Sequence, residues 1–310
     1  MRYVVGYTAN ARGGDAVNLA VALARRQGAT LDLVMVLPED SPYNGVYPPV
    51  AGFESILAQQ VSQWLDDGLA MIPEDVPAAA HVFRGESEAA VLIEAAGELG
   101  ASALVIGASS TGLFKRFSIG SVASALLHAS PVPVVLAPSG YSRTAPITRL
   151  TCAVGTREGA EGVLTVGVST AKRRGLPLRL VSLVALGSED AGTSVADAKE
   201  HLRSIAEASQ TLEASTLDKL DIDVVVGSGR TIEDAVDALP WKKGEILLIG
   251  SSRLAQKNSI FLGSTANRIL RALPVPMIVV PRDYVGTDDD LLQTNQVPVL
   301  DAADPTEVAK

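Results

Sequence analysis

The chain has 310 residues, of which 47% are apolar and 20% charged, so it is long enough to bury one large core or two ordinary ones, and disorder throughout is excluded. Its formal net charge of −9 repels a phosphate backbone, so we expect no nucleic acid partner. The single cysteine, Cys152, excludes an intrachain disulfide and a cysteine-based zinc site, and a reducing cytoplasm is the expected compartment.

Neither the beginning of the chain nor its longest uncharged stretch indicates export or membrane insertion. Residues 1–6 lack the apolar run and the small-residue cleavage site of a signal peptide. The uncharged stretch 117–142 contains His128 and three prolines, which would break a membrane helix. We therefore expect a soluble protein with no membrane partner.

Short β-branched runs alternate with longer helical stretches, which is typical of βα units and a parallel sheet. In the first half, we expect strands near residues 2–7, 31–37, 78–84, 102–107 and 132–137. The first helix, residues 12–27, carries an apolar stripe and ends before Gly28, a usual residue after a helix C-terminus. In the second half, we expect strands near residues 149–155, 177–185, 222–227, 245–250 and 275–280.

An internal repeat relates the two halves. Three segments recur at an offset of 143 residues: 130–138 as 273–281, 105–107 as 248–250, and 119–121 as 262–264. Near the start of each half, Val5-Gly6 matches Val154-Gly155 at an offset of 149. The difference between the two offsets predicts that the second half is six residues shorter, in the loop after its second strand.

The sequence thus predicts an α/β fold made of two tandem, doubly wound, flavodoxin- or Rossmann-like domains with parallel five-stranded sheets, residues 1–140 and 149–282. Residues 283–310 carry −6 of the net charge and few aromatic side chains. We expect this acidic tail to be disordered and to solubilise the protein or contact a partner. The remaining net charge, −3, does not exclude an anionic ligand.

The fifth strand of each half is apolar and flanked by proline, at residues 132–137 and 275–280. In a flavodoxin-like strand order it lies at the edge of its sheet, and an exposed apolar edge invites a partner strand. We therefore expect the two fifth strands to pair with each other and join the halves. The sequence leaves open whether two whole chains also form a homodimer.

A ligand of an open α/β sheet lies at the carboxyl ends of the strands that flank the topological switch point, here the first and fourth strands. After the fourth strand come Gly107 and then Gly120-Ser121, which precede a stretch of helical composition. Gly107 lets a sugar or phosphate approach the backbone, while Gly120 and Ser121 place free N–H groups and a hydroxyl at a helix N-terminus. This combination is suited to an anion.

With these motifs the chain resembles a tandem universal stress protein over nearly its whole length except the tail. The nucleotide-binding members of that family carry Gly-x-x-Gly, nine residues, then Gly-Ser or Gly-Thr. The outer residues match in both halves, as Gly107 with Gly120-Ser121 and Gly250 with Gly263-Ser264. The inner glycine is Ser110 in the first half and Arg253 in the second.

The resemblance implies ATP or another adenine nucleotide as ligand, with Mg²⁺ accompanying ATP. Ser110 is small and can donate to phosphate, whereas Arg253 is bulky and is expected to fill the phosphate space of the second half. The family's aspartate, two residues after the glycine of the first strand, is replaced by Thr8 and Arg157. The resemblance also places Val36 and Leu37 near the adenine.

Each of these positions also has a purely structural interpretation. Gly107 and Gly250 can end strands, Gly120 and Gly263 can allow close helix–sheet packing, and Val36 can belong to the core. Thr8 can cap the following helix. The basic pairs Arg25-Arg26 and Arg173-Arg174, near helix C-termini, are expected to be solvated charges and no binding patch.

The sequence gives no support for an enzyme. It contains no Walker loop, no complete dinucleotide fingerprint and no nucleophile elbow, and His81, His128 and His201 have no metal or triad spacing. The leading expectation is a cytoplasmic stress-response protein that binds a nucleotide in its first half and presents a ligand-dependent surface to an unidentified protein partner. The alternative is a nucleotide-free scaffold. A third hypothesis, slow nucleotide hydrolysis or autophosphorylation, would use the hydroxyls of Ser109, Ser110, Thr111 and Ser121.

Overall fold

In the computed structural model, the residues described are 1–39, 53–108, 120–155, 161–186, 194–211, 220–252, 254–257, 259–282 and 284. Several predicted features lie outside this part of the chain. They are the loop with Ser109, Ser110 and Thr111, the substituted positions Arg157 and Arg253, and the acidic tail apart from Tyr284.

The first half contains the strands β1 (Arg2–Gly6), β2 (Thr30–Leu37), β3 (Ala78–Arg84), β4 (Ala103–Gly107) and β5 (Val134–Ala137). Its helices are α1 (Ala11–Gln27), α2 (Phe53–Ala70), α3 (Glu88–Glu98) and α4 (Ser121–Ala129). The expected strands are confirmed to within two residues. Gly28 ends α1 in the left-handed conformation, with φ of 64°, as its position after the helix predicted.

The second half repeats this order with β6 (Arg149–Ala153), β7 (Leu178–Ala185), β8 (Ile222–Gly229), β9 (Glu245–Gly250) and β10 (Met277–Val280). Its helices are α5 (Glu161–Arg174), α6 (Val195–Thr211), α7 (Ile232–Asp237) and α8 (Ser264–Ala272). Strands and helices alternate in both halves, which confirms the predicted α/β class.

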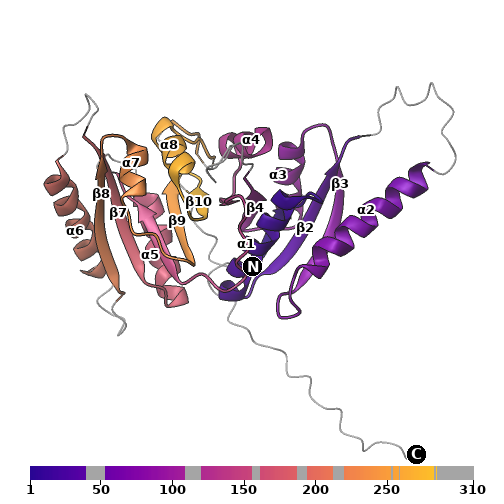
Figure 1. The fold of residues 1–310 in the computed structure, drawn as a ribbon, viewed down its shortest axis with the longest axis horizontal. Coiled ribbons are helices and arrows are strands. Elements are labelled where there is room, and N and C mark those ends of the chain that lie inside the picture. Colours follow the sequence, from indigo (N-terminus) through magenta and orange to yellow (C-terminus); the bar gives the residue numbers. More distant parts are fainter. Residues whose placement is uncertain are drawn as a thin grey trace, which may run out of the picture.

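All ten strands form one sheet, in the order β3-β2-β1-β4-β5-β10-β9-β6-β7-β8. Each half is parallel and doubly wound, and β5 and β10 pair antiparallel at the centre, with Val135 opposite Ile278. Figure 1 shows the consequence, with β9 and β10 on one side of the middle of the molecule and β4 on the other. The expected pairing of the two fifth strands is confirmed, so the halves share a continuous sheet.

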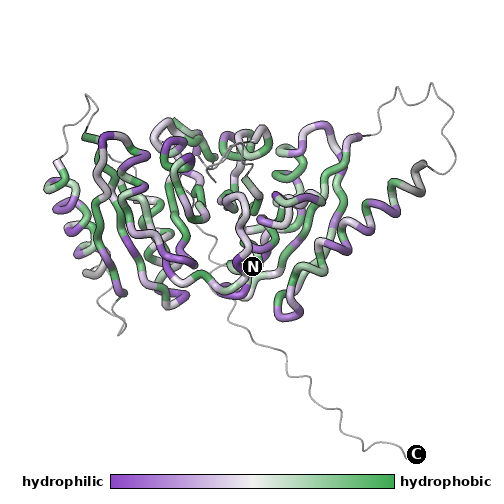
Figure 2. Tube along the Cα trace, viewed as in Figure 1, coloured by the Kyte–Doolittle hydropathy of each residue, from purple (hydrophilic) through white to green (hydrophobic). Residues whose placement is uncertain are grey.

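Each face of the sheet is covered by helices from both halves. One hydrophobic cluster packs α1, α2, α5 and α6 on the sheet, and a second packs α3, α4, α7 and α8 on the opposite face. Neighbouring strand residues divide between the clusters, as Val4 and Val5 do. The strands are accordingly apolar along most of their length (Figure 2), as expected for a parallel sheet buried on both sides.

The hydrogen-bonded register corrects the predicted alignment of the two halves. Val5 pairs with Val105 of β4, and Cys152 pairs with Leu248 of β9. Because Val105 corresponds to Leu248 at the offset of 143, Val5 corresponds to Cys152, an offset of 147 residues. The match of Val5-Gly6 to Val154-Gly155 is therefore wrong by two residues, because a short Val-Gly dipeptide recurs without structural equivalence. The second half is four residues shorter, not six.

The location of the shortening is largely as predicted. Leu31 pairs with Ala78 and Leu178 with Ile222, so the offset falls from 147 to 144 between the second and third strands. It falls to 143 by the fourth strand, where Gly107 corresponds to Gly250. Three of the four missing residues thus come from the segment between the second and third strands.

None of the helices in the described ranges is both long and apolar enough to cross a membrane.

Candidate functional site

The strand order reverses between β1 and β4 in the first half and between β6 and β9 in the second. The carboxyl ends of these strands are where an open α/β sheet binds ligands. Gly107 ends β4 and Gly250 ends β9, while the N-termini of α4 and α8 follow along the chain. The structure therefore contains one candidate site in each half.

Gly107 is held against the first turn of α1. A Cβ atom at Gly107 would lie 2.1 Å from the backbone oxygen of Arg12, far inside van der Waals contact. The same turn depends on Gly13, where a Cβ would lie 1.9 Å from the backbone oxygen of Thr8. Close helix–strand packing is therefore sufficient to explain the glycine at position 107.

Among the residues that the structure describes, Gly250 shows no such constraint, although the counterpart of Arg12, residue 159, lies outside them. A Cβ there would meet Val163 at 3.5 Å, which is ordinary contact. The two glycines match in sequence and register but have different neighbours within the described part of the chain.

Thr8 lies half-buried in the turn after β1. Its hydroxyl donates a 3.0 Å hydrogen bond to the side-chain oxygen of Asn10. That oxygen also accepts from the backbone N–H groups of Arg12 and Gly13, so Asn10 caps α1 and Thr8 supports the cap. The cap was missed in the sequence, although an asparagine just before a helical stripe is a recognisable signal.

The corrected register assigns Thr8 a different counterpart in the second half. Because Val34 O accepts from Tyr7 N and Val181 O from Val154 N, Tyr7 corresponds to Val154 and Thr8 to Gly155. Arg157 is therefore not the counterpart of Thr8, as the sequence alignment had it. The position is occupied by a non-acidic residue in both halves.

Gly120 and Gly263 begin α4 and α8 in nearly identical conformations, with φ and ψ of −68° and 169° against −67° and 166°. Among the described residues, no side-chain capping hydrogen bond is made to either helix, and Ser121 and Ser264, the first helical residues, are exposed. The first backbone N–H groups of each helix are thus available to an anion. The two halves are therefore alike in this feature, and the assignment of these residues to a ligand site stays a prediction.

Val36 and Leu37 end β2 on opposite faces of the sheet. Val36 packs against the cluster under α3, and Leu37 against the cluster under α1. Both are half-buried, and Val36 pairs with Phe83 of β3. Their burial agrees with the core interpretation, and their place at the carboxyl end of β2 agrees with a position beside a ligand.

The segment between β9 and α8 folds back on itself and onto the first half. Ser252 N donates to Phe261 O at 2.8 Å, and Phe261 N donates to the Ser251 hydroxyl at 2.8 Å. Leu262 N donates to Leu127 O of α4, and His128 packs edge-on against the Phe261 ring, with centroids 5.2 Å apart. In the second half, the approach to the candidate site is therefore part of the junction between the halves.

The buried charges lie elsewhere, near the amino ends of the strands. Asp32, fully buried, accepts from Arg2 at 2.9 Å and lies 2.8 Å from His81 Nε2. Glu245, also fully buried, accepts from Arg149 and Thr151. Within the described ranges, no group of three His, Cys, Asp or Glu side chains is placed to hold a metal.

The arginines at the C-terminal ends of α1 and α5 differ from the expectation that they are solvated. Arg25 forms an ion pair with Asp75 at 2.7 Å, but the Nε atoms of Arg26 and Arg174 are buried without a hydrogen-bond partner. Arg26 donates instead through Nη2 to the backbone oxygen of Arg174. The expectation that these arginines are simply solvated is therefore wrong.

The chain is similar to known proteins over both halves. The sequence model of the universal stress protein family matches residues 1–138 and 146–281. Universal stress proteins of Mycobacterium bovis and Mycobacterium tuberculosis H37Rv are each 31% identical over 293 residues, covering 91% of this chain and all of the relative.

A solved structure supports the fold independently. The crystal structure of a universal stress protein from Archaeoglobus fulgidus superposes with a TM-score of 0.66 at 18% identity, covering 90% of this chain and 98% of that one. At this identity the likeness establishes the two-part architecture alone.

Proposed function

The chain belongs to the universal stress protein family, and on this premise we propose that it is a cytoplasmic stress-response protein whose first half binds an adenine nucleotide. ATP, with Mg²⁺ when ATP is the ligand, would lie at the carboxyl ends of β1 and β4. The observation that carries the proposal is the N-terminus of α4 at Gly120 and Ser121, which no side chain in the described part of the chain caps and which follows the strand that flanks the switch point.

Each residue near this site has a defined part in the proposal. The N–H groups at the start of α4 and the Ser121 hydroxyl would donate to phosphate oxygens. Thr8, whose hydroxyl points to the Asn10 cap, would line the sugar side in place of the family's aspartate. Val36 would contact the base. These residues bind and orient, and no catalytic residue is proposed.

The second half is proposed to bind nucleotide weakly or not at all, although it retains Gly250, Gly263 and Ser264. The segment before α8 is hydrogen-bonded through Ser251 and Ser252 to Phe261, and it contacts α4 of the first half. A ligand entering here would compete with contacts that hold the halves together. Arg282 also holds the segment before α8, because it donates a hydrogen bond to Ala255 O at 3.1 Å.

The test compares matched substitutions in the two halves. ATP, ADP and AMP are titrated calorimetrically into the full chain with Mg²⁺, after molecules released by denaturing the purified protein have been analysed. Gly120→Val and Gly263→Val introduce a branched side chain at positions whose extended backbone tolerates it, beside the first N–H groups of α4 or α8. We expect Gly120→Val to abolish the binding heat and Gly263→Val to leave it unchanged.

Three outcomes would contradict parts of the proposal. No released nucleotide and no heat at millimolar ATP would favour the nucleotide-free scaffold. Equal loss in the two variants would show that both halves bind. Turnover of ATP into ADP, or transfer of phosphate to the chain, would require an enzymatic function.

A further inference from the structure

A cavity of about 530 Å³ lies between the two halves, on the face of the sheet covered by α1 and α5. Its floor includes Val135 and Ile278, the two residues that face each other across the β5–β10 junction. These residues correspond to each other in the repeat, so the cavity lies on the pseudo-twofold axis of the molecule. It is separate from the candidate nucleotide site of the first half, because its first-half wall is formed by Tyr3, Ala103 and Pro133 near the amino ends of β1, β4 and β5.

The floor and walls of the cavity are predominantly apolar. Leu150, Leu248 and Val280 join Val135 and Ile278 on the sheet, and Leu23 contributes from α1. The volume is within the range of about 300 to 1,000 Å³ typical of pockets for small organic ligands. Such a lining is suited to the apolar body of a ligand.

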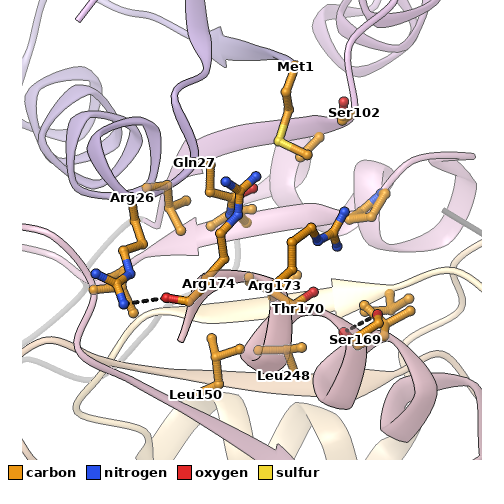
Figure 3. A pocket seen from close by; sticks show the side chains of 18 of the residues that line it. Met1, Arg26, Gln27, Ser102, Leu150, Ser169, Thr170, Arg173, Arg174 and Leu248 are labelled. Atoms are coloured by element: carbon orange, nitrogen blue, oxygen red, sulfur yellow. Dashed lines mark hydrogen bonds between the residues drawn. The ribbon is translucent and has the colours of Figure 1, made fainter. Parts of the chain in front are cut away.

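Three arginines make the same cavity cationic. Arg26 comes from the last turn of α1, and Arg173 and Arg174 from the last turn of α5. In Figure 3, Arg173 and Arg174 extend from α5 toward the end of α1, where Arg26 and Gln27 lie. No Asp or Glu is among the described residues that line the cavity.

The guanidinium groups are incompletely satisfied. Arg174 forms no side-chain hydrogen bond or ion pair with any described residue, and its Nε is buried. The Nε of Arg26 is likewise buried and without a partner, although its Nη2 donates to Arg174 O and, at 3.2 Å, to Gly175 O. Buried charged donors without acceptors are costly, and an anion in the cavity would remove that cost.

The cavity is lined along the length of α5, whereas the corresponding part of α1 is covered by the segment after β5. Asn18 donates to Tyr141 O at 3.0 Å, and Asp15 accepts from Gly140 N at 2.9 Å, so the segment after β5 lies along α1. The counterparts of Asn18 and Asp15 in α5 are Thr165 and Gly162, which line the cavity. The ligand space therefore extends along α5.

We propose that this cavity binds an amphipathic anion with a carboxylate head and a single unbranched hydrocarbon chain. The carboxylate would be held by Arg26, Arg173 and Arg174, since guanidinium groups form strong charge-assisted hydrogen bonds with carboxylates. The hydrocarbon chain would lie over Val135 and Ile278. Because the walls come from both halves, such a ligand also stabilises their junction.

The test is calorimetric titration of the full chain with dodecanoate below its micelle concentration, with dodecanol and dodecyltrimethylammonium as neutral and cationic probes of the same length. Arg174→Gln and Arg173→Gln should each weaken dodecanoate binding by about tenfold or more. Arg25→Gln is the matched control, because Arg25 ends α1 like Arg26 but pairs with Asp75 outside the cavity. Its affinity should stay within about twofold of the unsubstituted chain.

A second variant tests the apolar space. Ser169→Phe adds a ring to an exposed position of α5 that lines the cavity, so it should block binding while leaving the fold intact, as judged by the unfolding transition. Binding of dodecanoate to Ser169→Phe at full affinity, or equal binding of the three probes, would overturn the proposal. Displacement of dodecanoate by ATP would also overturn it, since the cavity would then be the nucleotide site.

Discussion

The two halves have the same strand order and the same helix cover, yet matched positions carry different physical constraints. At the end of the fourth strand, Gly107 leaves no room for a Cβ atom beside Arg12 O, whereas a Cβ at Gly250 meets only Val163 among the described residues, at an ordinary distance. At the end of the first strand, Thr8 donates to a helix cap, whereas its counterpart Gly155 has no side chain. Identical residues at matched positions of a repeat can therefore have different structural roles.

The cores and surfaces of the halves show the same divergence. Val5 and Ala20 of the first half correspond to Cys152 and Gly167 of the second, where a Cβ at Gly167 would lie 2.2 Å from the Cys152 sulfur. Glu233 and Arg268 form an ion pair between α7 and α8, and the corresponding residues of α3 and α4, Ala89 and Ala125, are both alanine. Corresponding positions of the two halves thus differ in their side-chain contacts.

The largest expected difference concerns the two strand-end glycines. Gly107→Ala should lower the free energy of unfolding by about 3 kcal/mol, since the clash is with backbone that cannot rotate away. Gly250→Ala should cost less than about 1 kcal/mol, because among the described residues its Cβ would meet only Val163, at a normal distance. Urea denaturation of the two variants measures both values. Equal losses would remove the distinction between the halves.

An intermediate loss of stability is expected from a substitution in the core of the second half. Gly167→Ala should destabilise the chain by about 1 to 3 kcal/mol, because the new methyl group overlaps the Cys152 sulfur. Cys152→Ala removes the sulfur and should recover most of that loss in the double variant, which a double-mutant cycle measures as coupling. Additive losses would show that the two side chains do not share this space.

Thiol alkylation gives a second readout of the same core. Burial raises the pKa of the Cys152 thiol to about 12 and keeps the sulfur inaccessible, so alkylation at mildly alkaline pH should be slow in the unsubstituted chain. Gly167→Ala should accelerate it by increasing local opening. Rapid alkylation of the unsubstituted chain would contradict the burial of Cys152.

The smallest expected effect is the pH dependence of the Glu233–Arg268 pair. The hydrogen bond from Arg268 holds the pKa of Glu233 at about 2, below its ordinary value of 4.5. Because the folded state favours the carboxylate, the pair contributes stability above pH 4.5, and this contribution is lost as the pH falls toward 2. Glu233→Gln should therefore lower Tm slightly at neutral pH, by an amount that shrinks across this window.

Ala89, the first-half counterpart of Glu233, provides the control for that measurement. Both partners of the ion pair are partly exposed, so solvent weakens it. Ala89→Ser, at the corresponding position of the first half, introduces no charge and should change Tm by the same amount at every pH. A Tm difference for Glu233→Gln that is independent of pH would show that the pair contributes through packing.

Most of the fold could be predicted because its signals are local. Alternating apolar runs give the strands, Gly28 gives the end of α1, and the repeated Pro-Val-Pro segments give both the duplication and the apolar edges that pair as β5 and β10. The candidate site was predicted in part. Gly120 and Gly263 begin helices as expected, while the Asn10 cap and the true counterpart of Thr8 were missed.

The sequence by itself determined the α/β class, the two halves and their family, since these depend on periodicity and on motifs that survive substitution. Only the tertiary structure decided the alignment of β1 with β6, because register is set by hydrogen bonds between strands distant in sequence. It also decided why Gly107 is a glycine and where Arg26, Arg173 and Arg174 converge. The first depends on the packing of α1 against β4 within the first half, and the second on α1 and α5, which meet when the β5–β10 junction forms.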